Sequence, residues 1–224
     1  MKTCLVLAAL ARVAHADDND DARLAHAGAI AGMGAIYLAL DLGIDSPASC
    51  RWCSTNAFDR SLRTHWDGAG TLGTITTYGL VPLATAGLLT LSGDGTWRRT
   101  FDDLAPVVEA AAATSLVALG TKLAVARRRP DGSDNESFFS AQTSGAFALA
   151  VSSGVIASRH HYKLAPAIWA SGLVLASASG YFRIASDQHW ATDVAAGAVT
   201  GALVGLAWPT LVPTPSGIAA VGSF

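Results

Sequence analysis

Long runs of apolar and small residues are the feature that most restricts how this chain folds. Six segments with few charges are expected to form buried or membrane-spanning helices: residues 24–42, 71–91, 104–126, 143–158, 164–182 and 190–209. A membrane-spanning helix needs about 20 mostly apolar residues, and three of these segments meet that length clearly. Gly, Ala, Ser and Thr dominate them, and small residues let helices pack closely in lipid. We predict an all-α fold, a membrane-embedded helical bundle of about five to six helices.

The composition supports this fold class and argues against one kind of partner. Hydrophobic residues make up 51% of the chain and charged residues only 14%, whereas an ordinary soluble domain carries about 25% charged residues. The net charge is -2, and nucleic-acid-binding proteins have basic patches, so no nucleic acid is expected as a partner. A soluble, Ala-rich helical bundle is the alternative, because apolar helices of about 10–14 residues also form soluble cores.

The chain is expected to divide into four parts. Its start combines a basic residue, a short apolar run and an A-x-A motif, which are typical of a cleaved export signal. The four parts are a signal peptide (1–16), an N-terminal helix with a Cys-containing periplasmic loop (17–70), the main bundle (71–209) and a C-terminal tail (210–224).

Cys50 and Cys53 form a C-x-x-C motif in the polar loop. A zinc site would need further Cys or His ligands at matching spacing, and none is evident, so no metal is expected. A redox motif would need a thioredoxin-like βαβ context, which is absent. A structural disulfide on an oxidising face of the membrane is the preferred interpretation.

Loop charges predict the orientation of the bundle. Arg98 and Arg99 separate the second and third helical segments, and residues 159–163, between the fourth and fifth, are also basic. By the positive-inside rule these loops face the cytoplasm, so residues 122–142 and 183–193 face the periplasm. We expect a bacterial inner-membrane protein with a periplasmic site, the alternative being a soluble periplasmic protein.

A cleaved signal and a spanning segment 24–42 are incompatible with this orientation. Together they would change the number of spans and place residues 122–142 in the cytoplasm. Either the signal is retained or segment 24–42 does not cross the membrane, and the sequence leaves both open.

The first cluster of candidate site residues ends the third apolar segment. Lys122 and Arg129 are seven residues apart, about two helical turns, so we expect both on one helical face. Pro130 is expected to end that helix, because it cannot continue the hydrogen-bond ladder. Charged groups at membrane depth are costly and usually functional, so both cations are candidate anion ligands. Arg127 and Arg128 are interpreted as solvated or as ligands of lipid head groups.

The second cluster, residues 137–144, opens the fourth apolar segment and is rich in hydroxyl side chains. Helix N-termini present N–H groups and the positive end of the helix dipole to anions, and Ser140 and Thr143 would add hydroxyl donors. A simple Ser/Thr cap is the alternative, since such caps are common at helix starts.

The third cluster contains Arg183, His189 and Asp193. His189 and Asp193 are four residues apart, so on a helix their side chains meet. A carboxylate bonded to one ring nitrogen fixes the tautomer and frees the other nitrogen to attack. A structural ion pair is the alternative. With Lys122 and Arg129, Arg183 supplies a third cation for one phosphate, and arginine matches phosphate oxygens in pairs.

Together these clusters resemble the type-2 phosphatidic acid phosphatase superfamily, which includes lipid phosphatases, bacterial acid phosphatases and vanadium haloperoxidases. The family pattern is K-x(6)-R-P, then P-S-G-H, then S-R-x(5)-H-x(3)-D. Lys122–Pro130 matches the first motif in full. The third motif matches at Arg183, His189 and Asp193, with Phe182 in place of its Ser.

The middle motif departs from the family pattern. Residues 139–142 read Phe-Ser-Ala-Gln where P-S-G-H is expected, so only Ser140 is kept. The resemblance gives the missing His the role of protonating the leaving alcohol, and Gln142 cannot transfer a proton at neutral pH. General acid help is typically worth about 10²–10⁴-fold. Ala141 also gives the backbone less freedom than Gly, so turnover is open.

The resemblance implies a mechanism that needs no cofactor. His189 would attack phosphorus to form a phosphohistidine, Asp193 would stabilise the charged ring, and Gln142 would stand at the general-acid position. The implied phosphate ligands are Lys122, Arg129, Ser140, Ala141 and Arg183. Asp131, Asp134 and Glu136 are candidates for the missing acid, although solvated loop carboxylates are the preferred interpretation.

Three functions follow as expectations. The first is a phosphatase acting on a lipid or polyprenyl phosphate or diphosphate, with phosphorylated lipids or small phosphate esters and membrane lipids as its partners. The second is a catalytically impaired pseudoenzyme that binds a phosphorylated lipid or phosphate-like anion, because Gln142 replaces the general-acid His. The third, a vanadium haloperoxidase, is disfavoured because it requires that same His.

Overall fold

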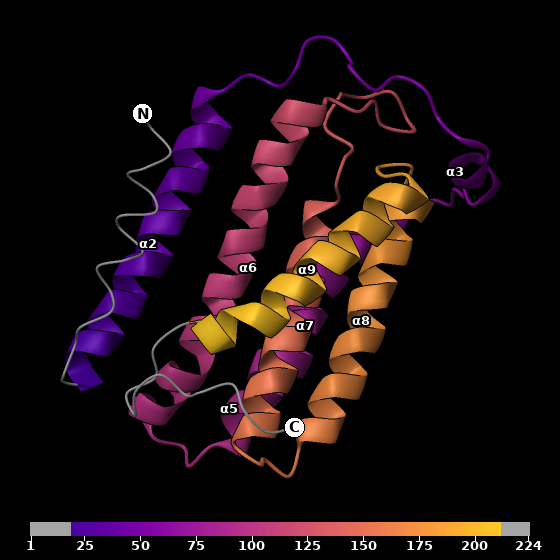
Figure 1. Ribbon diagram of the computed structural model, residues 1–224. Helices are drawn as coiled ribbons and strands as arrows, with labels where there is room; N and C mark the ends of the chain where they lie inside the picture. The colour runs from indigo at the N-terminus through magenta and orange to yellow at the C-terminus, as the bar shows by residue number, and fades with distance from the viewer. Residues whose placement is uncertain (1–18, 212–224) are drawn as a thin grey trace.

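The computed structural model describes residues 19–211, which form a bundle of long helices (Figure 1). Five of the helices are uninterrupted: α2 (Asn19–Gly43), α6 (Trp97–Val125), α7 (Ala141–Arg159), α8 (Ala165–Ala185) and α9 (Ala191–Leu211). A sixth rod is assembled from α4 (Ala69–Ile75), η2 (Thr76–Leu80), η3 (Leu83–Gly87) and α5 (Leu88–Ser92). The short α3 (Ala57–Ser61) lies in the first long loop. Each predicted helical segment coincides with one of these six rods.

The predicted all-α fold is confirmed. Between residues 19 and 211 the only β-type pairings are two isolated bridges, Trp52 with Arg127 and His65 with Ser186. The predicted signal peptide, residues 1–16, lies outside the described residues, as does the predicted tail beyond residue 211.

The rod from α4 to α5 widens into π-helical turns on both sides of Pro82. Proline has no N–H and its ring crowds the carbonyl four residues earlier, so it disrupts a regular α-helix. The Thr85 hydroxyl donates to the Val81 carbonyl oxygen at 2.7 Å, next to this interruption. The rod therefore stays continuous through a position that would otherwise break it.

Among residues 19–211, four helices are long and apolar enough to cross a membrane: Asp20–Gly43, Ala69–Ser92, Trp97–Val125 and Ala191–Thr210. Large apolar side chains project from the outer surface of the bundle, among them Leu38, Val174 and Leu203. A water-soluble bundle would bury such side chains, whereas lipid is an apolar solvent for them. The exterior thus fits a membrane-embedded protein.

Helices α7 and α9 are in backbone contact. A Cβ atom added to Gly197 would lie 2.7 Å from the Ser140 carbonyl oxygen, and one added to Gly201 would overlap the Ser144 carbonyl. In Figure 1, α9 crosses α7 obliquely. The small residues predicted to allow close helix packing are located at this crossing.

Helix α2 lies beside α6 and is attached to it by polar side chains (Figure 1). The Arg23 guanidinium donates to both carboxylate oxygens of Asp102, at 2.9 and 2.7 Å. Deeper in the bundle, His26 Nδ1 lies 2.8 Å from Glu109 Oε1, and Trp208 Nε1 donates to Glu109 Oε2 at 3.0 Å. These groups are satisfied by one another, as charged and polar groups at membrane depth require.

The loops gather at two opposite ends of the bundle. At one end Arg98 pairs with Asp20 near the start of α2, with 3.4 Å between Nη2 and Oδ2, and the Arg99 guanidinium donates to the Tyr162 hydroxyl at 2.8 Å. The loops that follow α2, α6 and α8 meet at the other end. All predicted site residues lie at this second end.

Candidate active site

His189 lies in the loop between α8 and α9, almost completely buried with 3% of its surface exposed. Its Nδ1 is 2.7 Å from the carbonyl oxygen of Ser137. A carbonyl oxygen only accepts hydrogen bonds, so Nδ1 carries the proton and Nε2 keeps its lone pair. This is the tautomer that a nitrogen nucleophile requires.

The surroundings of His189 keep the ring uncharged. Burial lowers the pKa of His189 well below its ordinary value, and the positive charges of Arg129, Lys122 and Arg183 lower it further. A neutral imidazole is therefore favoured at physiological pH. Arg129 and Arg183 converge on the side chain of Gln188, the residue before His189, and Lys122 is near enough to lower the same pKa.

The structure corrects how Arg129 reaches this place. Helix α6 ends before Ala126, which adopts the left-handed conformation with φ of 47°. Trp52 then forms a bridge with Arg127 and draws the chain away from the helix axis. The predictions that Lys122 and Arg129 share a helical face and that Pro130 ends the helix are wrong, because the loop pairing ends it first.

The two arginines have unequal partners. Arg129 Nε donates to Asp134 Oδ1 at 2.6 Å. Arg183, in the last turn of α8, is 9% exposed, and its Nε has no hydrogen-bond partner among residues 19–211. A buried guanidinium N–H without an acceptor is costly. An anion at this position would satisfy it.

The start of α7 supplies the other predicted ligands. The Ser140 hydroxyl caps the helix, accepting from the N–H and the hydroxyl of Thr143 at 3.4 and 2.9 Å. The capping alternative therefore describes Ser140 correctly. The N–H groups of Ala141 and Gln142 take part in none of the hydrogen bonds found within residues 19–211. They remain directed at the helix N-terminus, where anions bind favourably.

Asp193 holds His189 indirectly. The shortest approach between His189 Nδ1 and Asp193 Oδ2 is 4.0 Å, beyond hydrogen-bond reach. Ser137 joins the two, because its hydroxyl donates to Asp193 Oδ2 at 2.5 Å while its carbonyl accepts from the ring. The predicted direct contact assumed one helix for both residues, but α9 begins at Ala191 and leaves His189 in the loop.

Arg127 is a central residue that the sequence interpretation missed. It is fully buried and pairs with two carboxylates, Asp193 and Asp59, the latter at 2.5 Å from Nη2. The Trp52 ring lies 4.0 Å from its guanidinium carbon, a cation–π distance. The expectation that Arg127 is solvated or bound to lipid head groups is wrong. Arg128 is exposed at its side chain, as expected.

Asp59 connects the first long loop to α9. It accepts from the backbone N–H and the hydroxyl of Thr192, both at 2.9 Å. Burial raises the pKa of Asp59, but the hydrogen bonds from Thr192 and Arg127 outweigh it and leave that pKa below the ordinary value. Asp59 is therefore an ionised, buried anchor. Its one local partner, Asn56, donates to Asp59 Oδ2 at 3.1 Å, but Arg127 and Thr192, which tie it to the site, are 68 and 133 residues away and leave no signal in the nearby sequence.

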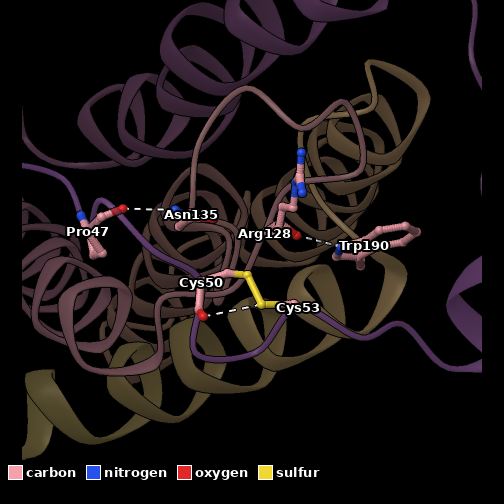
Figure 2. Close-up of a disulfide and its surroundings, with 6 residues drawn as sticks. All are labelled: Pro47, Cys50, Cys53, Arg128, Asn135 and Trp190. Carbon is pink, nitrogen blue, oxygen red and sulfur yellow. Dashed lines mark hydrogen bonds between the residues drawn. A yellow bond between two sulfur atoms is a disulfide. The ribbon is translucent and has the colours of Figure 1, made fainter.

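The loop that carries Asp59 is fastened to the site end of the bundle (Figure 2). Cys50 and Cys53 are joined by a disulfide. Beside it, the Asn135 side chain donates to the Pro47 carbonyl at 2.8 Å. The Trp190 indole donates to the Arg128 carbonyl at 2.9 Å. The Cys-containing loop is thus attached to the loop that follows α6.

A hollow of about 460 Å³ opens beside Arg183. Its walls include His65, Thr71 and Thr74 from the start of α4 and the loop before it, and Gln188 from the loop after α8. The hollow offers space next to the cations for a group attached to phosphorus. Within the described chain, no group of three or more His, Cys, Asp or Glu side chains is placed to hold a metal ion.

The three predicted replacement acids are already engaged. Asp134 pairs with Arg129, Glu136 accepts from the Ser46 hydroxyl at 2.5 Å, and Asp131 accepts from the Gln188 amide at 2.9 Å. The site as a whole can therefore bind a compact anion between three cations and a helix N-terminus, beside a neutral imidazole with a free lone pair.

The chain belongs to the PAP2 superfamily, whose sequence profile matches residues 103–216, just over half of its length. Over 84 residues, 38% of this chain, it is 37% identical to the lipid A 1-phosphatase of Porphyromonas gingivalis. The chain spans only 18% of the length of that relative.

A solved structure supports the fold. The chain resembles the crystal structure of a transmembrane PAP2 type phosphatidylglycerolphosphate phosphatase from Bacillus subtilis with a TM-score of 0.50. The match covers 79% of this chain and 92% of that one at 18% sequence identity. Low identity limits the likeness to the fold, which is a membrane-embedded helical bundle, as predicted.

Proposed function

We propose that the chain is a phosphoric ester hydrolase that releases phosphate from a phosphorylated lipid. The proposed substrate is a lipid or polyprenyl phosphate or diphosphate. The observation that carries this proposal is His189, a buried imidazole with a free Nε2 and three cations close by. Such a ring is a nucleophile poised against a dianionic phosphoryl group. The lipid substrates named for both relatives support a lipid phosphate.

The proposed reaction has two steps. His189 Nε2 attacks phosphorus, the bond from phosphorus to the leaving oxygen breaks, and the alkoxide takes a proton from water. The hydroxide that this water leaves then attacks the phosphorus of the phosphohistidine, the P–N bond breaks, and phosphate leaves with the ring neutral again. Lys122, Arg129 and Arg183 stabilise the negative charge on the phosphoryl oxygens.

Ser137 and Asp193 support the ring while it is phosphorylated. The ring becomes positively charged when Nε2 bonds to phosphorus, so its Nδ1–H becomes a stronger donor to the Ser137 carbonyl. The Asp193 carboxylate, 4.0 Å away, offsets the new charge. In this proposal Asp193 acts by electrostatics and through Ser137.

Gln142 favours a second candidate, a protein that binds phosphorylated lipids or phosphate-like anions with little turnover. It occupies the position of the family's general acid and has no proton to transfer at neutral pH. The neighbouring carboxylates are engaged elsewhere. This candidate uses the same phosphate ligands and differs only in catalysis.

We place the site at the periplasmic face of the inner membrane. Arg98, Arg99 and residues 159–163 lie at the end of the bundle opposite the site, which fits the positive-inside rule. The Cys50–Cys53 disulfide lies at the site end, and disulfides persist in oxidising compartments such as the periplasm. In this orientation the start of α2 is cytoplasmic.

Phosphate release by the detergent-purified chain tests the proposal. His189→Ala is expected to abolish release, and His161→Ala, which changes an exposed His at the opposite end, is expected to leave it unchanged. Unchanged release in His189→Ala would reject the nucleophile.

Gln142→His separates the two candidates. With a lipid phosphate, whose alcohol is a poor leaving group, the variant is expected to raise turnover by about 10²–10⁴-fold. With an aryl phosphate, whose phenolate leaves without a proton, the gain is expected to be much smaller. Turnover that appears only in Gln142→His would support the binding protein over the hydrolase.

A further inference from the structure

Gln188 occupies the point where the two arginines of the site converge. Its side-chain oxygen Oε1 accepts from Arg129 Nη1 at 2.7 Å and from Arg183 Nη2 at 3.3 Å. On its other side, Nε2 donates to Asp131 Oδ2 at 2.9 Å. A single neutral amide thus engages both guanidinium groups and is itself held by a carboxylate.

A phosphoryl group bound at this place needs the same donors. Guanidinium groups bind phosphate through the N–H groups at their ends, usually two at a time. Two of these terminal nitrogens, one on Arg129 and one on Arg183, already donate to Gln188. Hydrogen bonds from a cation to an anionic acceptor are roughly twice as strong as neutral ones, so phosphate can displace the amide, but only by breaking its bonds.

The side chain of Gln188 has room to leave. It borders the hollow of about 460 Å³ whose walls also include Thr71 and Thr74. The backbone next to it is fixed, because the N–H groups of Gln188 and His189 both donate to the Arg183 carbonyl at 3.2 Å. A rotation of the side chain into the hollow would therefore free the arginines without moving the nucleophile.

We propose that Gln188 sets the phosphate affinity of the site by competing with the phosphoryl group for Arg129 and Arg183. This inference rests on the proposed function only in taking these arginines as phosphate ligands. Phosphate binds only when Gln188 has released the two arginines. Its apparent affinity is therefore reduced by the fraction of molecules in which the arginines are released. The competition lowers the affinity of the site for every oxyanion. Weakly bound head groups of the surrounding lipids are therefore the first to be excluded from it.

The dissociation constant of inorganic phosphate, measured by calorimetry on the full chain in detergent, tests the proposal. Gln188→Met keeps the size of the side chain and removes the acceptor, so the constant is expected to fall by about 2- to 12-fold, the worth of one net hydrogen bond. Gln188→Glu gives the arginines an anionic partner, so the constant is expected to rise. Asn135→Ala, which loses only a loop amide, is the matched control and should leave it unchanged.

An equal or larger constant in Gln188→Met would overturn the proposal, because Gln188 would then assist phosphate binding instead of opposing it. Absence of binding in both the natural chain and Gln188→Met would overturn it too, since the arginines would then not form a phosphate site. Binding can be measured without turnover, so the two proposals can fail separately. If the natural chain releases no phosphate but Gln188→Met binds phosphate more tightly than the natural chain does, the hydrolase is refuted and this inference is supported.

Discussion

Replacing Asp59 with Ala tests the buried network around Arg127. The substitution removes the acceptor for Arg127 Nη2 at 2.5 Å and for two donors of Thr192 at 2.9 Å. Asp59 is 1% exposed and Arg127 is completely buried, so water cannot replace the lost bonds. Arg127 would keep Asp193 as its only carboxylate partner.

The expected loss of stability follows from this burial. Removing one partner of a buried ion pair typically costs about 3–5 kcal/mol, because the remaining charge is left uncompensated. Here Asp193 compensates part of that charge, so the lower half of the range is expected. At about 2–4 °C per kcal/mol for a chain of this size, the melting temperature should fall by roughly 6–16 °C.

Thermal unfolding in detergent, followed by far-UV circular dichroism, measures this change. Arg63→Ala is the matched control: Arg63 pairs with Asp187, but its side chain is about half exposed, and exposed pairs contribute about 0–1 kcal/mol. Asp59→Asn keeps an acceptor oxygen and should recover at least half of the loss. If Asp59→Ala is no less stable than Arg63→Ala, the network does not hold the loop to the bundle.

Two further predictions concern packing and pH. Gly201→Ala adds a methyl group against the Ser144 carbonyl and should destabilise the chain by about 1–3 kcal/mol. Gly145→Ala, whose added Cβ would have no atom within 4 Å, is the control and should be neutral or stabilising. Equal melting temperatures of the two variants would contradict the backbone contact. Because the pKa of His189 lies well below its ordinary value and the neutral ring attacks, kcat/KM should fall in acid only well below about pH 6.5. Arg129→Ala removes a charge that lowers this pKa and should move the acid limb to higher pH, and a pH profile that does not move would refute the electrostatic coupling.

The long helices were predictable from sequence because each depends on a local property. A run of small apolar residues about the length of a membrane span is read directly from the chain. The observed rods match the predicted limits within three residues, except that α2 and α6 begin earlier, at Asn19 and Trp97, with polar and charged turns. The residues of the family motifs could also be named in advance, since each motif is short, and their catalytic roles stay predictions. For Ser140 the sequence left two roles open, phosphate ligand and helix cap. Its hydrogen bonds to Thr143 show that it caps α7.

The rest depended on contacts that no short segment contains. Helical spacing predicted that Asp193 bonds His189 and that Arg129 shares a face with Lys122, but both predictions extended a helix beyond its real end. Those ends are set by tertiary contacts, such as the bridge between Trp52 and Arg127. The arginine-rich stretch was read as surface because its buried carboxylate, Asp59, lies 68 residues earlier in the sequence.

The glycine contacts between α7 and α9 divide the surroundings of the site into a rigid side and an adjustable side. At Gly197 and Gly201 the two backbones touch, so the start of α7 and the loop that carries His189 keep one fixed spacing. Thr71 and Thr74 face the site from exposed positions with no such constraint. Under the proposed function, substitutions on the α4 side can change which group attached to phosphorus fits, whereas the small residues along α9 should be retained in relatives.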